Sequence, residues 1–207
     1  MDQQLLDPGT WRPVLSLVLA ALVVMGSPGP STISVTAVGA AFGFRRSLPY
    51  VSGLILGTTA VLLAIAAGLV SILLSLPRLA PVLLGLSVAY MIYLAFRIAT
   101  APPLSEPGKD VQAPGLVGGF LLAVANPKAY LAIAAVFTGT TLAVDSRLTE
   151  TVIKTAVLTG MIVLIHVAWL VAGSAFARLL RQPTASRIAN LLFAAILLAT
   201  TAMAIVR

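Results

Sequence analysis

Three adjacent residues, Asn126, Pro127 and Lys128, constrain the fold more than any other feature, because they interrupt the apolar segment 115–143 near its middle. Pro127 has no N–H and breaks or kinks a straight helix. Asn126 is a preferred N-cap residue. Lys128 carries an amine into a segment of hydrocarbon length, at a cost of at least about 2.5 kcal/mol. Together they predict a helix start in mid-segment, with Asn126 as N-cap and Pro127 at the first helical position.

A second interruption, Ser27-Pro28-Gly29-Pro30, lies near the middle of the apolar segment 13–42. It predicts another helix start, at Pro28. Both interrupted segments are longer than the roughly 20 residues that one straight span needs, as expected of a discontinuous helix. An ordinary transmembrane proline kink is the alternative explanation for each interruption taken alone.

Composition fixes the class of protein. The chain is 59% hydrophobic and 9% charged, with a mean hydropathy of +1.06, whereas soluble domains carry roughly 25% charged residues. The net charge of +7 comes from basic residues scattered at segment ends, which fits membrane flanks better than nucleic-acid binding. Cys is absent, so disulfides and thiolate metal sites are excluded. We predict an all-α integral membrane protein whose surroundings are the lipid bilayer.

Six apolar segments have the length of a membrane span. They cover residues 13–42, 49–75, 79 or 81 to 99, 115–143, 152–177 and 188–206. The proline-rich stretch 101–114 separates three segments from three, and its composition predicts a flexible cytoplasmic linker. We therefore predict a single transmembrane domain made of two three-helix repeats, residues 1–100 and 115–207.

The two halves follow the same order: an interrupted helix comes first, and two uninterrupted helices follow. Because three is an odd number, the second half must enter the membrane from the opposite side, which predicts an inverted-topology repeat. The loops hold seven Lys and Arg residues on one side and five on the other, where Arg147 and Lys154 are counted. The positive-inside rule then predicts that both termini lie outside.

The two interruptions also predict a binding site. A helix that starts in mid-membrane has N–H groups without intrahelical partners and a partial positive charge. Two such starts, brought together by the repeat and joined by Lys128, would form an electropositive pocket. Such a pocket favours an anionic group, for example the carboxylate of a small metabolite.

Three further polar residues lie at similar depth. His166 is the sole histidine and could carry a proton or bind substrate, or simply make an interhelical hydrogen bond. Trp169 shares its helix face and is either a pocket wall or lipid-facing bulk. Tyr90 is a candidate substrate contact, although core packing with a hydroxyl partner is the better explanation of it. The pair Gly53-x-x-x-Gly57 predicts close helix packing.

No Asp or Glu lies inside any of the six predicted segments. Carboxylate metal sites, paired-carboxylate catalysis and a carboxylate proton relay therefore lack their residues. The sole histidine also has no buried acid to orient it for nucleophilic catalysis. We expect no enzyme activity, no metal and no cofactor.

Four features carry a family resemblance: Ser27-Pro28-Gly29-Pro30 followed by Gly43-Phe44-Arg45-Arg46 in the first cytoplasmic loop; Gly53-x-x-x-Gly57; Ala89-Tyr90-Met91-Ile92-Tyr93-Leu94; and Gly119-Phe120-Leu121 leading into Asn126-Pro127-Lys128-Ala129. On these the chain resembles the lysine-exporter (LysE) superfamily, nearest its homoserine/threonine-exporter (RhtB-like) branch. The resemblance spans essentially the whole chain.

The resemblance implies gradient-driven export of an amino acid or a related metabolite across a bacterial inner membrane. Carried over residue by residue, it makes substrate-site candidates of two motifs: Pro28, Gly29 and Pro30, and Asn126, Pro127 and Lys128. Many relatives have Asn or Asp directly after the first motif, whereas this chain has Ser31, which can only hydrogen-bond.

Our prediction is an exporter in which Lys128 and the two helix starts hold a substrate carboxylate. Lys128 or His166 would couple protons, and one repeat would rock against the other. A passive channel and a non-transporting membrane scaffold are the competing predictions. The small size is compatible with a homodimer, although no sequence feature specifies the oligomeric state.

Overall fold

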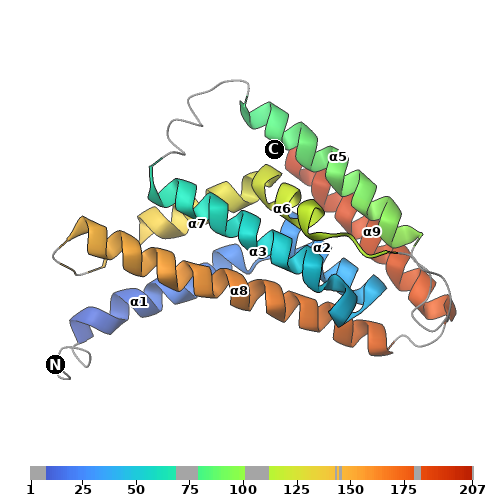
Figure 1. Cartoon of the computed structure of the whole chain (residues 1–207), viewed down its shortest axis with the longest axis horizontal. Helices are drawn as coiled ribbons and strands as arrows, with labels where there is room; N and C mark the ends of the chain where they lie inside the picture. The colour runs from blue at the N-terminus through green and yellow to red at the C-terminus, as the bar shows by residue number, and fades with distance from the viewer. Residues whose placement is uncertain are drawn as a thin grey trace.

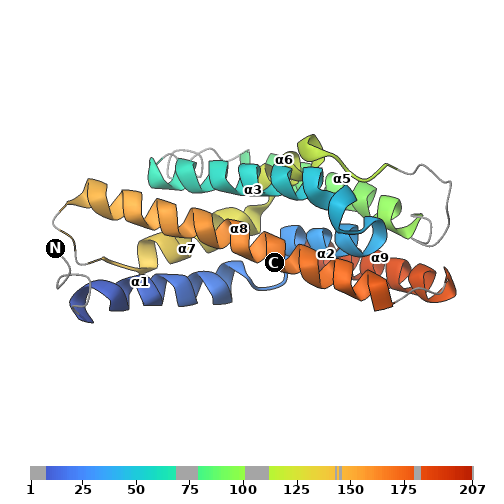
Figure 2. The ribbon, with the colours of Figure 1, turned by 60° about the horizontal axis from the view of Figure 1, so that its bottom comes forward.

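The computed structural model describes residues 8–68, 79–100, 112–142, 144, 146–179 and 183–206. All secondary structure in these residues is helical, as predicted (Figures 1 and 2). The elements are α1 (Pro8–Ala20), the π-helical turn η2 (Ala21–Met25), α2 (Pro30–Phe42), α3 (Phe44–Ala66), α5 (Leu79–Ala99), α6 (Leu116–Ala125), α7 (Pro127–Gly139), α8 (Arg147–Leu179) and α9 (Pro183–Val206).

Several of these helices are candidate membrane spans. Among the described residues, α3 and the stretch Arg147–Phe176 of α8 are each long and apolar enough to cross a membrane. The two bent helix pairs, α1–η2 with α2 and α6 with α7, raise this number to as many as four. Helices α5 and α9 occupy the positions of the other two predicted segments and lie side by side (Figure 1).

Both predicted interruptions are present, and the chain bends by 69° at the first and 64° at the second. The second agrees with the sequence in detail, because Asn126 is the N-cap of α7 and Pro127 its first residue. The first helix start was predicted two residues too early. Gly29 is fully extended, at φ −172° and ψ −179°, so α2 begins at Pro30, where the missing N–H of proline costs no hydrogen bond.

Helices α2 and α3 are joined through the single residue Gly43, whose positive φ of 77° favours glycine. The predicted cytoplasmic loop at Gly43-Phe44-Arg45-Arg46 is therefore wrong, since Phe44 already begins α3. Pro49, predicted as the start of this segment, lies inside the helix.

Helix α8 begins at Arg147, five residues before the predicted segment, and its first turns contain charged groups that the sequence placed in a loop. Lys154 Nζ lies 2.7 Å from Glu150 Oε1 and donates to Phe137 O, near the end of α7, at 3.0 Å. Glu150 also accepts from Leu142 N at 3.0 Å. This network extends the helix beyond the predicted segment, so that Glu150 lies inside α8, and it buries Lys154, which the charge count had assigned to a loop.

Glycines let helices from the two halves of the chain touch backbone to backbone. A side chain at Gly53 of α3 would collide with Leu116 O, and one at Gly57 would lie 2.7 Å from Phe120 O. The predicted glycine packing is thus confirmed, with α6 as the partner helix. Helices α2 and α8 pack in the same way, since a side chain at Gly173 would collide with Thr36 O.

The predicted linker falls almost wholly on residues 101–111, which lie outside the described residues. The repeat boundaries that depend on this stretch stay predictions. The described helices nevertheless fix the region where the two interruptions meet.

Candidate functional site

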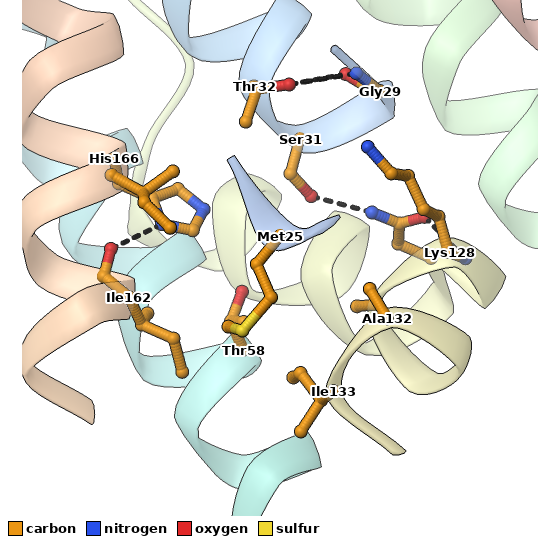
Figure 3. Close-up of a pocket in the computed structure, with 13 residues that line it drawn as sticks. Met25, Gly29, Ser31, Thr32, Thr58, Lys128, Ala132, Ile133, Ile162 and His166 are labelled. Carbon is orange, nitrogen blue, oxygen red and sulfur yellow. Dashed lines mark hydrogen bonds between the residues drawn. The ribbon is translucent and has the colours of Figure 1, made fainter. Parts of the chain in front are cut away.

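A cavity of about 40 Å³ lies where the two interruptions meet (Figure 3). Residues from η2, α2, α3, α7 and α8, together with the two interruptions, line it. The lining residues are Met25, Gly29, Ser31, Thr32, Thr58, Asn126, Lys128, Ala129, Ala132, Ile133, Ile162, Ile165 and His166. The cavity is thus bounded by both halves of the chain.

Lys128 joins the two interruptions across about a hundred residues of sequence. Its Nζ donates to Ser27 O at 2.6 Å, to Ser27 Oγ at 2.8 Å and to Pro28 O at 2.9 Å. Ser27 Oγ gives its own hydrogen to Val24 O at 2.8 Å, so it can only accept from the lysine. Three acceptors around one nitrogen are fully satisfied only by three N–H donors, so this geometry favours the ammonium form of Lys128.

The charge of this ammonium is not balanced by an acid. No carboxylate pairs with Lys128 among the residues that the structure describes, and the cavity lining contains no Asp or Glu. Lys128 therefore contributes a positive field to the cavity but no free N–H. The sequence predicted direct contact between this amine and a substrate carboxylate. In the structure, the amine instead donates to Ser27 and Pro28 and can act on a carboxylate only through its charge.

Asn126 satisfies the start of α7 by itself. Its Oδ1 accepts from Lys128 N at 3.1 Å, and its backbone carbonyl accepts from Ala129 N at 3.0 Å. Its Nδ2 donates to Ser31 Oγ at 2.8 Å, which forms a second link to the other interruption. The N–H groups of Lys128 and Ala129, at the start of α7, are consequently occupied, contrary to the predicted anion site at that helix start.

The start of α2 is different because its N-cap, Gly29, has no side chain. Gly29 N donates to Thr32 Oγ1 at 2.9 Å. Over the described ranges, however, no acceptor is found for the amide N–H groups of Ser31 and Thr32. Both residues are buried and line the cavity. The start of α2 therefore presents N–H groups, and the partial positive charge of a helix start, to the cavity.

Two buried polar atoms at the cavity have no hydrogen-bond partner in the described part of the chain: His166 Nε2 and Thr58 Oγ1. The side chains are 5% and 6% exposed. The other ring nitrogen of His166, Nδ1, lies 2.8 Å from Ile162 O. An unpartnered polar group at this depth costs about 1–3 kcal/mol, so its persistence next to a cavity requires an explanation.

Of the residues predicted from the sequence, Gly29, Ser31, Asn126, Lys128 and His166 line the cavity. The prolines of the two motifs shape the interruptions without lining it.

Trp169 and Tyr90 also lie outside the lining. Trp169 is half-buried, and its Nε1 donates to Gly26 O at 3.2 Å, so it supports the first interruption. Tyr90 packs against the core cluster that includes Leu54 and Met91. The sequence reasoning missed Thr32 and Thr58, because a threonine inside an apolar helix carries no distinguishing local signal.

Comparisons with known proteins identify similar sequences. A family model described as LysE type translocator matches residues 22–206. Proteins named cysteine/O-acetylserine efflux protein from Escherichia coli strain K12, Shigella flexneri serotype 5b strain 8401 and Shigella sonnei strain Ss046 are each 30% identical over 162 residues, covering 78% of this chain and 82% of theirs. No solved structure matches the chain.

Proposed function

Because the chain belongs to the LysE type translocator family, we propose that it exports a small amino acid or related metabolite, driven by an ion gradient. Membership of this family makes the protein a membrane transporter and not an enzyme, located in the bacterial inner membrane. Its partners are a small-molecule substrate and the bilayer. The names of the similar proteins make L-cysteine and O-acetyl-L-serine the first substrates to test.

The cavity between the two interruptions carries this proposal. A substrate carboxylate would accept hydrogen bonds from the free N–H groups of Ser31 and Thr32 at the start of α2. The positive charge of Lys128 would stabilise it there. Pro28, Pro30 and Pro127 act by breaking the helices, and Asn126 acts by capping α7 and holding Ser31. Trp169 acts indirectly, because its hydrogen bond to Gly26 O supports the first interruption.

We further propose that residues 1–100 and 115–207 are inverted three-helix repeats, joined by a linker at 101–114, with both termini outside. The order of helices supports this arrangement, because it is the same in both halves. The first half has a bent helix pair followed by α3 and α5, and the second half has a bent helix pair followed by α8 and α9. The homoserine/threonine branch, a homodimer and proton coupling through Lys128 or His166 remain part of the same hypothesis.

Transport in proteoliposomes tests the function. The purified full-length protein would be reconstituted, and efflux of labelled L-cysteine, O-acetyl-L-serine, L-serine, L-homoserine, L-threonine and L-lysine would be followed with and without an imposed pH gradient. We expect gradient-dependent movement of one small class. Lys128→Gln should reduce that movement at least about 100-fold, because the cavity then loses its only charge.

Lys154→Gln provides the matched control, since Lys154 is also buried but does not line the cavity. This variant should keep the substrate preference of the wild type. Equal movement of every solute down its own gradient would favour a passive channel. Absence of any movement by correctly inserted protein would contradict the exporter assignment.

A further inference from the structure

We propose that His166 and Thr58 bind the ammonium group of the substrate, so that the cavity selects zwitterionic amino acids over carboxylates that lack the amine. This inference rests on the proposed function, because it assigns a specificity role within the same cavity. Its starting point is that the two unpartnered buried polar atoms, His166 Nε2 and Thr58 Oγ1, both belong to residues that line the cavity.

The chemistry of His166 Nε2 follows from its partner on the other nitrogen. A backbone carbonyl only accepts hydrogen bonds, so the 2.8 Å contact with Ile162 O places the ring hydrogen on Nδ1. No carboxylate lines the cavity to balance an imidazolium, and the neutral ring then has a lone pair on Nε2. Figure 3 shows this nitrogen turned away from Ile162 toward the pocket. It is an acceptor that lacks a donor.

Thr58 Oγ1 is the second acceptor. Threonine inside a helix commonly returns its hydroxyl hydrogen to a backbone carbonyl one turn earlier, as Thr36 does toward Thr32 O at 2.9 Å. In the described part of the chain, no such bond holds the hydroxyl of Thr58. A hydroxyl and an imidazole nitrogen on the contacting helices α3 and α8, both lining the cavity, can together accept two of the three hydrogens of a primary ammonium.

The electrostatics of the cavity set the orientation of the substrate. In Figure 3, His166 and Thr58 lie on one side of the pocket, and Lys128 lies on the opposite side. The ammonium of Lys128 would repel the ammonium of a substrate and attract its carboxylate. An α-amino acid with its carboxylate toward Ser31 and Lys128 would place its own ammonium at the acceptor side.

Cavity size limits the side chain. A volume of about 40 Å³ accommodates roughly three water molecules at about 10–15 Å³ each. Only small substrates fit without movement of the walls, and the walls beside Met25, Ile133 and Ile165 are apolar. The substrate class inferred from these features is an α-amino acid with a short, uncharged side chain.

Paired substrates test this inference in the reconstituted full-length protein. L-serine is compared with 3-hydroxypropionate and L-cysteine with 3-mercaptopropionate, each pair differing only in the amine. The wild type should move the amino acid at least about tenfold faster than its deaminated analogue. Thr58→Val should slow the amino acid by about 10- to 100-fold and leave the analogue within about twofold. Because His166 is also the proposed proton-coupling residue, His166→Leu is judged by the ratio of the two rates, which should fall by at least about tenfold.

Conservative variants keep the result interpretable. Thr58→Ser retains the hydroxyl and His166→Gln retains an acceptor, so each should recover most of the preference for the amine. The inference is overturned if Thr58→Val and His166→Leu slow both members of a pair equally, or leave their ratio unchanged while the wild type transports. A failure of the proposed function has a different signature, since the wild type would then move no amino acid at all.

Discussion

The two interrupted helices carry similar proline motifs, yet they are stabilised in opposite ways. The interruption between α6 and α7 is one residue long, and Asn126 caps the following helix with its own side chain. The interruption before α2 covers residues 26–29, and its N-cap Gly29 can offer no side chain. Its carbonyl groups are instead satisfied by residues from the second half, namely Lys128 and Trp169.

The difference teaches that similar sequence motifs need not make equivalent structures. The second interruption is self-sufficient and also supplies two side chains, Lys128 and Asn126, to the first. The first interruption depends on this support, and in return it keeps two backbone N–H groups available at the cavity. Substitutions that remove the support should therefore act on the first interruption more than on the second.

The largest effect is expected for Lys128→Met, which keeps the volume of the side chain but removes all three hydrogen bonds to Ser27 and Pro28. Leaving these acceptors unpaired should cost about 1–3 kcal/mol of stability. Export should fall at least about 100-fold. Thermal unfolding in detergent and proteoliposome transport measure the two effects. Because Ser27→Ala removes one of the three acceptors, a Lys128–Ser27 double-mutant cycle should show coupling; strict additivity would contradict the cross-link.

Gly29→Ala should give the next largest effect. A Cβ at Gly29 would lie 2.6 Å from Lys128 Cδ and 2.8 Å from Nζ, so the lysine must move away from its three acceptors. Export should fall more than about tenfold. Gly115→Ala is the matched control, since Gly115 is also a helix N-cap and its Cβ would meet nothing within 4 Å. Equal transport by the two variants would show that packing at Gly29 is unimportant.

Asn126 variants separate capping from cross-linking. Asn126→Ala removes both the cap of α7 and the bond to Ser31, and should lower stability by about 1–2 kcal/mol. Asn126→Ser retains a capping oxygen and should recover roughly half of that loss, since it cannot reach Ser31 as a donor. The midpoint of thermal unfolding reports the difference. Identical midpoints for the two variants would mean that only the cross-link matters.

Trp169→Phe should have the smallest effect. It keeps the ring and removes only the hydrogen bond from Nε1 to Gly26 O, which is worth about 0.5–1.5 kcal/mol. A fall of a few degrees in the unfolding midpoint, with transport within about threefold of wild type, is expected. A loss of transport as large as that of Lys128→Met would instead place Trp169 in direct contact with substrate.

Local signals allowed much of the fold to be predicted. The start of α7 was predicted to the residue, because N-cap and first-turn preferences act within four residues. Charged residues misled the prediction at α8, where Glu150 and Lys154 look like a loop but pair one helical turn apart. Gly43 misled it at α3, because a single residue with positive φ replaces an entire loop.

The candidate site was only partly predictable. Lys128 and Asn126 are conspicuous because polar residues in an apolar segment are costly. Their partners Ser27 and Ser31 are fixed by tertiary packing between segments far apart in sequence. Thr58 could not be found from the sequence at all, since its distinguishing property is a missing hydrogen bond.

The glycine contacts between α3 and α6, and between α2 and α8, have a mechanical consequence. Backbones in such close contact slide poorly past one another, so we expect each pair to move as one rigid unit that contains a helix from each half of the chain. The moving parts of a transport cycle would then cut across the two sequence halves. Thr58 belongs to the unit of α3 and α6, and His166 belongs to the unit of α2 and α8. A substrate bound between these two residues would therefore link the two units.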